Sequence, residues 1–251
     1  MSVDAASRSL LLRLVGMLVI FAGWEAVGSF RLAGLSWPPL TAVLVYLADS
    51  IRTPLFVRAV GATLAAVAIG YAFGCVVGLA LAMITHVMSI LRPGTDRAMA
   101  VIHAIPSIAL GPLFIVLLSR DATPVAIASL NVLFALYVAG ISGLASASKV
   151  HLDVMRALGA PLVRQLLHLD LPAALPAIVT GMKLAVPAAL IGDIIGEWFG
   201  APRGLGLLIV SAMQNFQILL LWSTVLLTAL VSLTLFGALT LLERLVYERF
   251  R

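Results

Sequence analysis

Three ionisable side chains lie in or directly after one long apolar stretch of this sequence, at 173–195. They are Lys183, Asp193 and Glu197. Because ionisable groups are costly at membrane depth, those found there often mark a solute pathway. Other roles are open: Lys183 could direct its amine to the membrane surface, and Asp193 could accept hydrogen bonds from a neighbouring helix. Glu197 precedes a loop rich in glycine and proline, which favours an outer gate. All three are candidate pathway or gate residues.

The remaining polar residues of the apolar stretches show no arrangement suited to catalysis. The histidines have no paired metal-ligand spacing, so no metal site is expected; they are His86, His103, His151 and His168. Serine and cysteine residues lack a nearby base, which leaves an intramembrane enzyme as a distant alternative. A lone histidine or asparagine in a helix bundle, such as His103 or Asn131, more often forms a hydrogen bond between helices. We therefore expect no catalytic residues.

The sequence also lacks the motif that binds ATP. It contains no Gly-x-x-x-x-Gly-Lys-Ser/Thr phosphate loop, and neither of its two lysines, Lys149 and Lys183, follows a glycine-rich loop. No cofactor is therefore expected on this chain.

The composition of the 251 residues restricts the class of protein. Hydrophobic residues make up 62% of the chain and charged residues 11%, whereas soluble domains carry about 25% charged residues. So few charges exclude a soluble enzyme and a disordered chain, and a single cysteine excludes a disulfide scaffold. The 16 Lys and Arg, against 11 Asp and Glu, are too scattered for a nucleic-acid-binding face. The composition predicts a polytopic membrane protein.

Apolar stretches of about 20 residues, the length that crosses a bilayer, recur throughout a single transmembrane domain, 1–251. Six spans are expected, at about 10–30, 55–88, 98–118, 122–146, 173–195 and 219–242. The first span has no cleavage site after it and should be retained. An amphipathic stretch at 40–52 is too short to cross and should lie in the membrane interface. The spacing of Gly70, Gly74 and Gly78 predicts close helix packing, as at a homodimer interface.

The distribution of Lys and Arg predicts the orientation, because basic loops stay in the cytoplasm. With the N-terminus inside, ten basic residues lie on the cytoplasmic side: Arg8, Arg13, Arg92, Arg97, Lys149, Arg156, Arg164, Arg244, Arg249 and Arg251. Five lie on the outer side: Arg31, Arg52, Arg58, Arg120 and Arg203. Both termini are therefore expected in the cytoplasm, in agreement with an even number of spans.

The longest cytoplasmic loop in this arrangement is 147–172, and its apolar residues recur at spacings of three and four. That spacing is typical of amphipathic helix. Gly159, Ala160 and Pro161 interrupt it, since glycine permits a turn and proline favours the start of a new helix. We therefore predict two short helices joined by a bend, which either project from the membrane or lie on its surface. Pro172 is expected to start the fifth span.

The same loop carries a motif with a known spacing. Asp153-Val154-Met155-Arg156-Ala157-Leu158-Gly159 is followed, after nine residues, by Leu169-Asp170-Leu171-Pro172. This resembles the EAA loop of ABC importer permeases, whose pattern is Glu-Ala-Ala, three residues, Gly, nine residues, Ile, one residue, Leu-Pro. Gly159, Leu171 and Pro172 match in identity, whereas Asp153 replaces the glutamate and larger residues replace the two alanines.

Two further segments are similar to permeases of the nitrate/sulfonate/taurine group. One is Ile105-Pro106-Ser107-Ile108-Ala109-Leu110-Gly111-Pro112-Leu113-Phe114, at the third span. The other follows the fifth span and reads Gly196-Glu197-Trp198-Phe199-Gly200-Ala201-Pro202-Arg203-Gly204-Leu205-Gly206. The similarity extends over nearly the whole chain from about residue 55.

The resemblance implies a fold, a mechanism and partners. It implies an all-α membrane protein with the six-helix type I ABC importer transmembrane fold, in a bacterial plasma membrane. The loop would be a coupling helix that fits a groove of an ATPase, because an apolar stripe suits a groove and charges fix its register. The coupling residues would be Asp153, Arg156, Ala157, Leu158, Gly159, Ala160, Leu171 and Pro172. The implied partners are a second permease copy, two ATPase subunits that use ATP and Mg, and a solute-binding protein.

Two other roles of Gly159 and Asp153 are compatible with the same pattern. Gly159 could be a helix C-cap and not a point of close approach to an ATPase. Asp153 could pair with a basic residue of the ATPase or could favour the helix dipole.

The resemblance leaves the solute open. It favours a small anion such as sulfonate, taurine or nitrate, with a thiamine-precursor pyrimidine or another small organic molecule as the alternative. A secondary transporter that works alone is a further possibility, although the short chain and the EAA spacing disfavour it.

Overall fold

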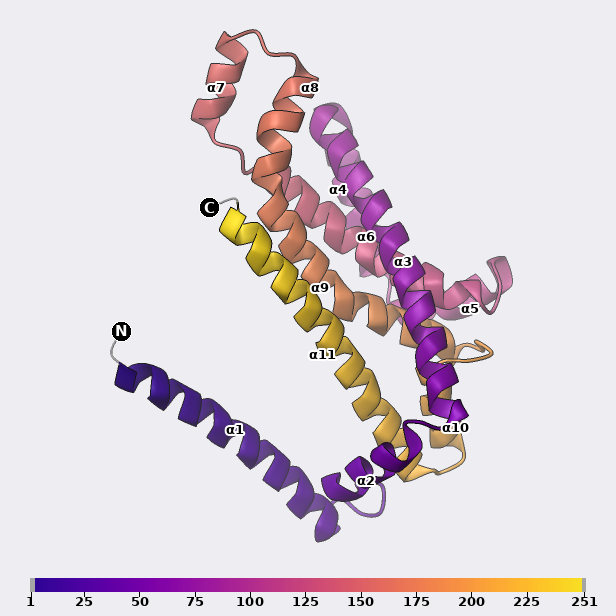
Figure 1. The fold of residues 1–251 in the computed structure, drawn as a ribbon. Coiled ribbons are helices and arrows are strands. Elements are labelled where there is room, and N and C mark those ends of the chain that lie inside the picture. Colours follow the sequence, from indigo (N-terminus) through magenta and orange to yellow (C-terminus); the bar gives the residue numbers. More distant parts are fainter. Residues whose placement is uncertain (1–2, 250–251) are drawn as a thin grey trace. The chain divides into compact units, whose positions relative to one another are not determined.

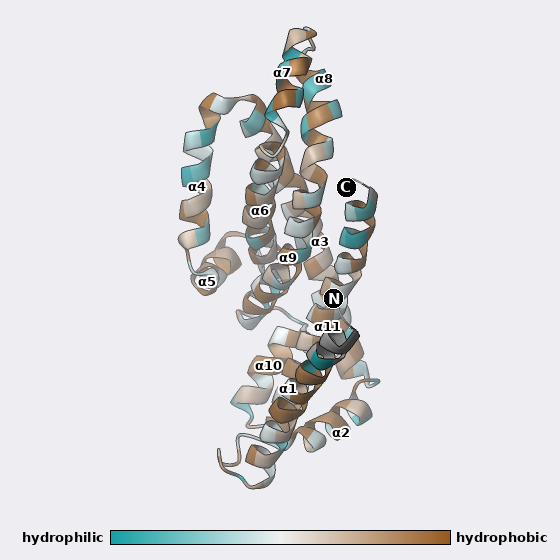
Figure 2. Cartoon of the chain, turned by 90° about the vertical axis from the view of Figure 1, so that its left-hand side faces the viewer, coloured by the Kyte–Doolittle hydropathy of each residue, from teal (hydrophilic) through white to brown (hydrophobic). Residues whose placement is uncertain are grey.

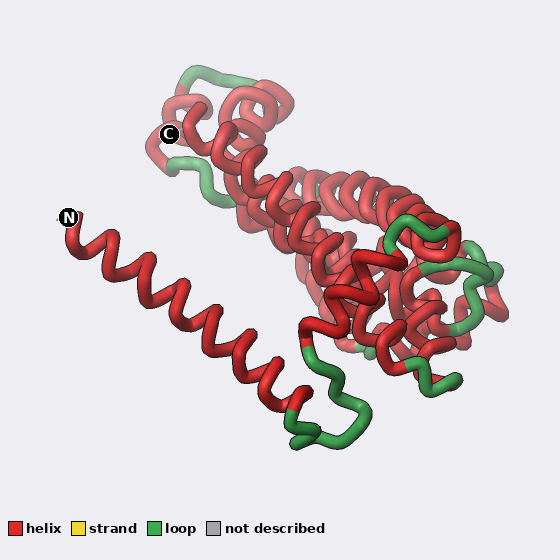
Figure 3. Tube along the Cα trace, turned by 60° about the horizontal axis from the view of Figure 1, so that its bottom comes forward, coloured by secondary structure: helices red, strands yellow, loops and turns green. Residues whose placement is uncertain are grey.

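The computed structural model describes residues 3–249, and this part of the chain is helical with no strand (Figures 1 and 3). The helices are α1 (Val3–Ser29), α2 (Leu40–Ser50), α3 (Pro54–Val87), η1 (Ser89–Leu91), α4 (Arg92–Ala104), α5 (Ser107–Leu117), α6 (Ala122–Leu144), α7 (Lys149–Ala157), α8 (Leu162–Gln165), η2 (Leu166–Asp170), α9 (Leu171–Trp198), α10 (Leu205–Gln214) and α11 (Ile218–Arg249). The predicted all-α class is confirmed. Arg251, which entered the charge count, lies outside the described residues.

Five stretches of the described chain are long and apolar enough to cross a membrane. They are Leu11–Ser29, Pro54–Val87, Ala122–Leu144, Leu162–Trp198 and Ile218–Glu248. A sixth crossing is reached if Ser89–Ala104 and Ser107–Leu117 count as one span, although they are bent by 94° relative to each other. In Figure 2 the apolar colour dominates α1, whereas hydrophilic residues are prominent on α4 and α7. The protein is therefore a multi-pass membrane protein.

The region expected to form a span at 98–118 differs from a continuous helix. It is divided at Ile105 and Pro106 into the end of α4 and the start of α5. A proline disfavours helical backbone in the residue before it, and Ile105 is extended, with φ −73° and ψ 121°. The break leaves backbone groups at two helix ends without intrahelical partners. Sequence reasoning placed Pro106 in a motif but missed its effect on the backbone.

For packing, the chain divides into two units, and the first contains residues 1–57 and 208–227. Three tryptophans form its centre: the ring of Trp222 lies 5.0 Å from that of Trp24 and 4.8 Å from that of Trp37. Glu25 accepts hydrogen bonds from the backbone N–H and the hydroxyl of Thr41, at 2.9 and 2.8 Å. Because Thr41 is in the first turn of α2, this carboxylate caps that helix. Glu25 is therefore a structural residue of its unit.

The second unit contains residues 58–207 and 228–251, and the contact between α6 and α9 forms its core. Small residues bring the two backbones together. A Cβ atom on Gly143 would lie 3.1 Å from the Cα of Ala174, and one on Gly192 would lie 3.0 Å from the Cα of Ala128. Small-residue contacts are the usual means of close helix association in membranes, where no hydrophobic effect drives helices together. The two helices run side by side in Figure 1.

The predicted close packing at Gly70, Gly74 and Gly78 is confirmed, but it occurs within the chain. Cβ atoms added at these positions of α3 would lie 2.6–2.8 Å from backbone carbonyl oxygens of α6, at Val125, Ser129 and Leu133. Any side chain there would force α3 away from α6. These glycines therefore do not present a free face to a second copy of the chain.

The loop at 147–172 is only partly as predicted. Its first short helix is α7, and Gly159 and Pro161 end it as expected. The second is not separate, because α8, η2 and α9 continue into one another from Leu162 to Trp198. Pro172 therefore lies inside a helix that begins before it and does not start the span. The reason is the π-helix η2, where the Leu171 N–H bonds to the Leu166 carbonyl, since the wider turn accommodates a residue that lacks its own N–H.

Candidate functional site

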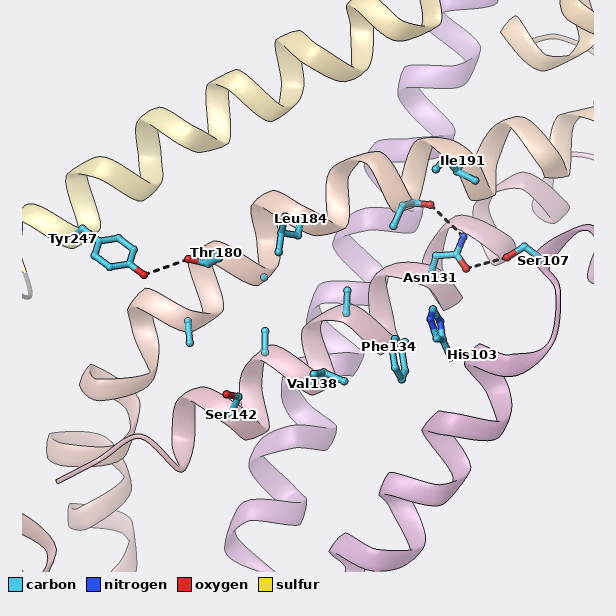
Figure 4. Close-up of a pocket in the computed structure, with 15 residues that line it drawn as sticks. His103, Ser107, Asn131, Phe134, Val138, Ser142, Thr180, Leu184, Ile191 and Tyr247 are labelled. Atoms are coloured by element: carbon cyan, nitrogen blue, oxygen red, sulfur yellow. Dashed lines mark hydrogen bonds between the residues drawn. The ribbon is translucent and has the colours of Figure 1, made fainter. Parts of the chain in front are cut away.

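A cavity of about 710 Å³ lies in the second unit, where α4, α5, α6 and α9 meet and the end of α11 contributes one residue (Figure 4). Most of its lining is apolar or small. Six residues supply polar groups: His103, Ser107, Asn131, Ser142, Thr180 and Tyr247. No lysine, arginine or carboxylate of the described chain lines it. A mostly apolar cavity with a few placed polar groups is the usual form of a small-molecule site.

One end of the cavity lies at the break between α4 and α5. The Ser107 hydroxyl donates to the Asn131 Oδ1 at 3.1 Å, and the Asn131 Nδ2 donates to the Ala188 carbonyl at 3.1 Å. Asn131 thus joins α5, α6 and α9, which is the interhelical role predicted for it. The His103 ring stacks on Phe134 with their centroids 3.8 Å apart. Discontinuous helices commonly form transport sites because their free backbone ends can face a solute.

At the other end, Thr180 of the cavity lining contacts an ion pair that was not predicted from the sequence. The Lys183 Nζ donates to the Glu243 Oε2 at 2.5 Å, and the Thr180 hydroxyl donates to the Glu243 Oε1 at 2.8 Å. The side chains of Lys183 and Glu243 are only 17% and 14% exposed. Lys183 does not line the cavity, so it neither faces a solute there nor extends to the surface as a free amine. The sequence shows that Lys183 places a charge in an apolar stretch, but it does not show that the partner is Glu243, 60 residues away.

Asp193 and Glu197 are buried away from this cavity, with 0% and 1% exposure. Glu197 accepts a hydrogen bond from the Thr63 hydroxyl at 2.7 Å and one from the Gly206 N–H at 2.6 Å. The Thr63 hydroxyl in turn accepts from the Leu205 N–H at 2.9 Å. Because these amides are in the first turn of α10, Glu197 and Thr63 together cap that helix. Glu197 therefore holds the loop that follows α9.

Asp193 has a different environment from its neighbour Glu197. It lies one helical turn earlier, and no backbone N–H, amine or hydroxyl group of the described residues donates to its carboxyl oxygens. The Asp193 side chain has no exposed surface, and its role in a solute pathway stays a prediction.

The hairpin formed by α7 and α8 lies beyond one end of α6 and α9 (Figure 1). Gly159 adopts a left-handed conformation, with φ +67°. Its N–H bonds to the Arg156 carbonyl and the Ala160 N–H bonds to the Met155 carbonyl, both at 3.0 Å. This pair of bonds is the Schellman motif that ends many helices. The C-cap role of Gly159 is therefore present in the chain itself.

The side chains of this hairpin face outward. Val154 and Leu158 are 51% and 77% exposed. Asp153 and Arg156 are exposed too, and their side chains approach each other at 3.9 Å. A Cβ atom on Gly159 would meet no atom within 4 Å. Asp153 lies in the second turn of α7, which begins at Lys149. It is therefore too far from the N-terminus of the helix to interact favourably with the helix dipole. The hairpin thus presents apolar and charged groups that no other described part of the chain covers.

Leu171 and Pro172 lie apart from the other predicted coupling residues. Both are half-buried in the helix that continues from the hairpin into the bundle. Between them and α7 lies Asp170, a buried residue that sequence reasoning left unassigned. It bonds to His86 at the end of α3. A pair of opposite polar residues on different helices gives no signal in sequence unless the helix contacts are known.

These features define a class of protein: a multi-pass helical membrane protein with a cavity at a broken helix and a separate exposed hairpin. Residues 70–251 match the family of the binding-protein-dependent transport system inner membrane component. The match covers both the cavity and the hairpin and more than half of the chain. The protein therefore belongs to this family and is an ABC importer permease subunit.

Individual relatives agree with this assignment. The chain is 30% identical to a "probable ABC transporter permease protein" of Haemophilus influenzae, over 72% of this chain and 73% of the relative. It is 28% identical to the formylaminopyrimidine transport permease protein of Halalkalibacterium halodurans, over 91% and 92% of the two chains. It is also 28% identical to the taurine transport system permease protein of Escherichia coli, over 56% and 50%.

Proposed function

We propose that this chain forms the translocation pathway of an ATP-driven importer and that its hairpin docks onto a separate ATPase. The observation that carries this proposal is the exposed, rigidly capped α7 hairpin with uncovered apolar residues. In this proposal Asp153, Arg156, Ala157, Leu158, Gly159 and Ala160 face the ATPase, while Leu171 and Pro172 join the hairpin to the bundle. An amphipathic helix that fits a groove is a recurrent way to join two proteins.

The proposed assembly contains two copies of this chain, two ATPase subunits and a solute-binding protein in a bacterial plasma membrane. ATP and Mg bind the ATPase and not this chain. The hairpin end and both termini lie in the cytoplasm, which agrees with the distribution of basic residues. The family to which the chain belongs, a binding-protein-dependent transport system, supports the need for a binding protein.

The proposed route of the solute runs along the cavity at the α4–α5 break. A small anion such as sulfonate, taurine or nitrate is supported by the taurine permease among the relatives and by the first turn of α5, whose N–H groups favour negative charge. A pyrimidine is supported by a specific feature of the cavity: the His103–Phe134 stack offers an aromatic surface beside the Asn131 amide. The formylaminopyrimidine permease, aligned over 91% of this chain, supports the same alternative.

Reconstitution tests both parts of the proposal. Purified chain in proteoliposomes, with its ATPase and binding protein, should take up radiolabelled solute only when ATP is present, and the chain alone should hydrolyse no ATP. Uptake without ATPase would instead indicate a secondary transporter. Thermal-shift screening of the binding protein with taurine, nitrate and formylaminopyrimidine should show which class it recognises. A shift with none of them would reject both solute classes.

A further inference from the structure

Asp170 is a buried carboxylate at the base of the hairpin. It is 2% exposed, and its Oδ2 accepts hydrogen bonds from the His86 Nε2 at 3.1 Å and from the Gln165 Nε2 at 3.3 Å. His86 lies in the last turn of α3, and Gln165 ends α8. Because a buried carboxylate is stable only when it is paired, these bonds fasten the end of α3 to the base of the hairpin.

The segment that holds Asp170 is an irregular turn of its helix. Residues Leu166–Asp170 form the π-helix η2, and Pro172 follows with no N–H to donate. π-helical turns often coincide with functional sites, and kinks concentrate where the regular ladder of hydrogen bonds is interrupted. A displacement of the hairpin could therefore be absorbed by bending at η2 before it reaches α9.

The contacts made within η2 and directly after it join the helix to two different neighbours. Beyond η2, the start of α9 packs directly against the end of α6, because a Cβ atom on Gly143 would lie 3.0 Å from the Ala174 carbonyl oxygen. Within η2, Asp170 is fastened to α3 through His86. The turn that contains the π-helix is thus held to α3, and the helix beyond it is held to α6.

Movement at the end of α3 would reach the cavity through a short connection. α3 is followed by η1 and then by α4, whose last turn carries His103. Near the start of α4, the Tyr137 hydroxyl of α6 donates to the Asp96 Oδ1 at 2.6 Å and provides a pivot. His103 and the α4–α5 break lie at the opposite end of α4 from this pivot, where they line the cavity.

We propose that the Asp170–His86 contact makes the end of α3 follow the hairpin, so that Asp170 and His86 are positioning residues for coupling. This inference rests on the proposed docking of the hairpin onto an ATPase. Without the contact, η2 bends, α3 stays in place and ATP hydrolysis no longer changes the cavity.

The test compares two histidine substitutions in the complete transporter complex. His86→Leu removes the α3 donor to Asp170. His168→Leu is the matched control, because His168 lies within η2 but is exposed, and its one hydrogen bond among the described residues is to the Arg164 carbonyl of its own helix. His86→Lys again places a donor opposite Asp170, and a double variant, His86→Asp with Asp170→His, exchanges the two groups. The measured quantity is solute transported per ATP hydrolysed in proteoliposomes.

We expect His86→Leu to lower this ratio at least about fivefold, the lower end of typical coupling between sites. His168→Leu should leave it unchanged, and His86→Lys should restore most of it. A ratio in His86→Leu equal to that of wild type would overturn the inference. If His86→Leu does not assemble, the exchanged double variant decides: wild-type coupling supports the contact, and loss of coupling in an assembled complex overturns it.

A distance measurement separates positioning from a merely structural role. Spin labels at exposed positions 87 and 163, in a Cys75→Ala background that removes the single cysteine, report the separation of α3 and α8. With His86 present, this separation should be the same with and without ATP. In His86→Leu it should change on ATP binding, and an unchanged separation there would also overturn the inference. A wild-type complex that shows no ATP-dependent uptake would reject the proposed function instead.

Discussion

Replacement of Gly159 distinguishes the two roles that this residue can have in coupling. Its φ of +67° is in the left-handed region, which costs an L-residue about 1–2 kcal/mol. Asparagine tolerates this region better than other residues, whereas a β-branched valine is strongly disfavoured there. Gly159→Asn should therefore keep the hairpin folded at a cost of well under about 1 kcal/mol, and Gly159→Val should not.

The space around Gly159 supplies the second half of the test. Since a Cβ atom there meets nothing within 4 Å in the chain, an asparagine side chain would extend into the region proposed to face the ATPase. If the close approach of two backbones is needed, Gly159→Asn should lower solute transported per ATP hydrolysed by about tenfold, equivalent to 1.4 kcal/mol. Amide hydrogen exchange at Ala160, whose N–H bonds to the Met155 carbonyl, checks that the hairpin remains folded.

The outcome for Gly159→Asn decides between the roles. Slow amide exchange at Ala160 together with weak coupling would mean that docking requires a residue without a side chain at position 159. Slow exchange with wild-type coupling would refute the close-approach argument and would leave the glycine as a C-cap only. Gly159→Val, which should lose both the slow exchange and the coupling, is the control for a hairpin that has unfolded.

Further substitutions test the buried polar contacts. Lys183→Met should destabilise the protein in detergent by about 2–3 kcal/mol, because Glu243 is left without its basic partner. The double variant, Lys183→Met with Glu243→Leu, should recover most of this loss. Equal melting temperatures for the single and double variants would contradict the pairing. Glu197→Gln should lower the free energy of unfolding by about 1–3 kcal/mol, since the glutamine amide cannot accept the hydrogen bonds from both Thr63 and Gly206. Asp193→Asn should change it little. Denaturant unfolding in micelles would measure the difference. Asn131→Ala should reduce the initial rate of uptake while assembly stays normal, and an unchanged rate would argue against the proposed route along the cavity.

Local sequence signals were sufficient for features that depend on the backbone of a few neighbouring residues. Apolar stretches gave the class of protein, because a bilayer imposes the same length on every crossing helix. Gly159 and Pro161 predicted the end of α7, since their backbone preferences do not depend on distant residues. Pro106 carried an equally local signal for the helix break, which sequence analysis overlooked because the surrounding residues are apolar.

The pairing of polar groups was decided by tertiary structure alone. Lys183 meets Glu243, Asp170 meets His86 and Glu197 meets Thr63 across 60, 84 and 134 residues of sequence. Which side chains meet depends on the rotation and register of each helix, and these are set by small-residue contacts such as Gly74 against α6. A one-residue shift turns a helical side chain by about 100°, so a small change in register would give each polar group a different neighbour. The sequence alone determined which residues are costly to bury, and only the packing of the helices determined which hydrogen-bond or ionic partner each of them has.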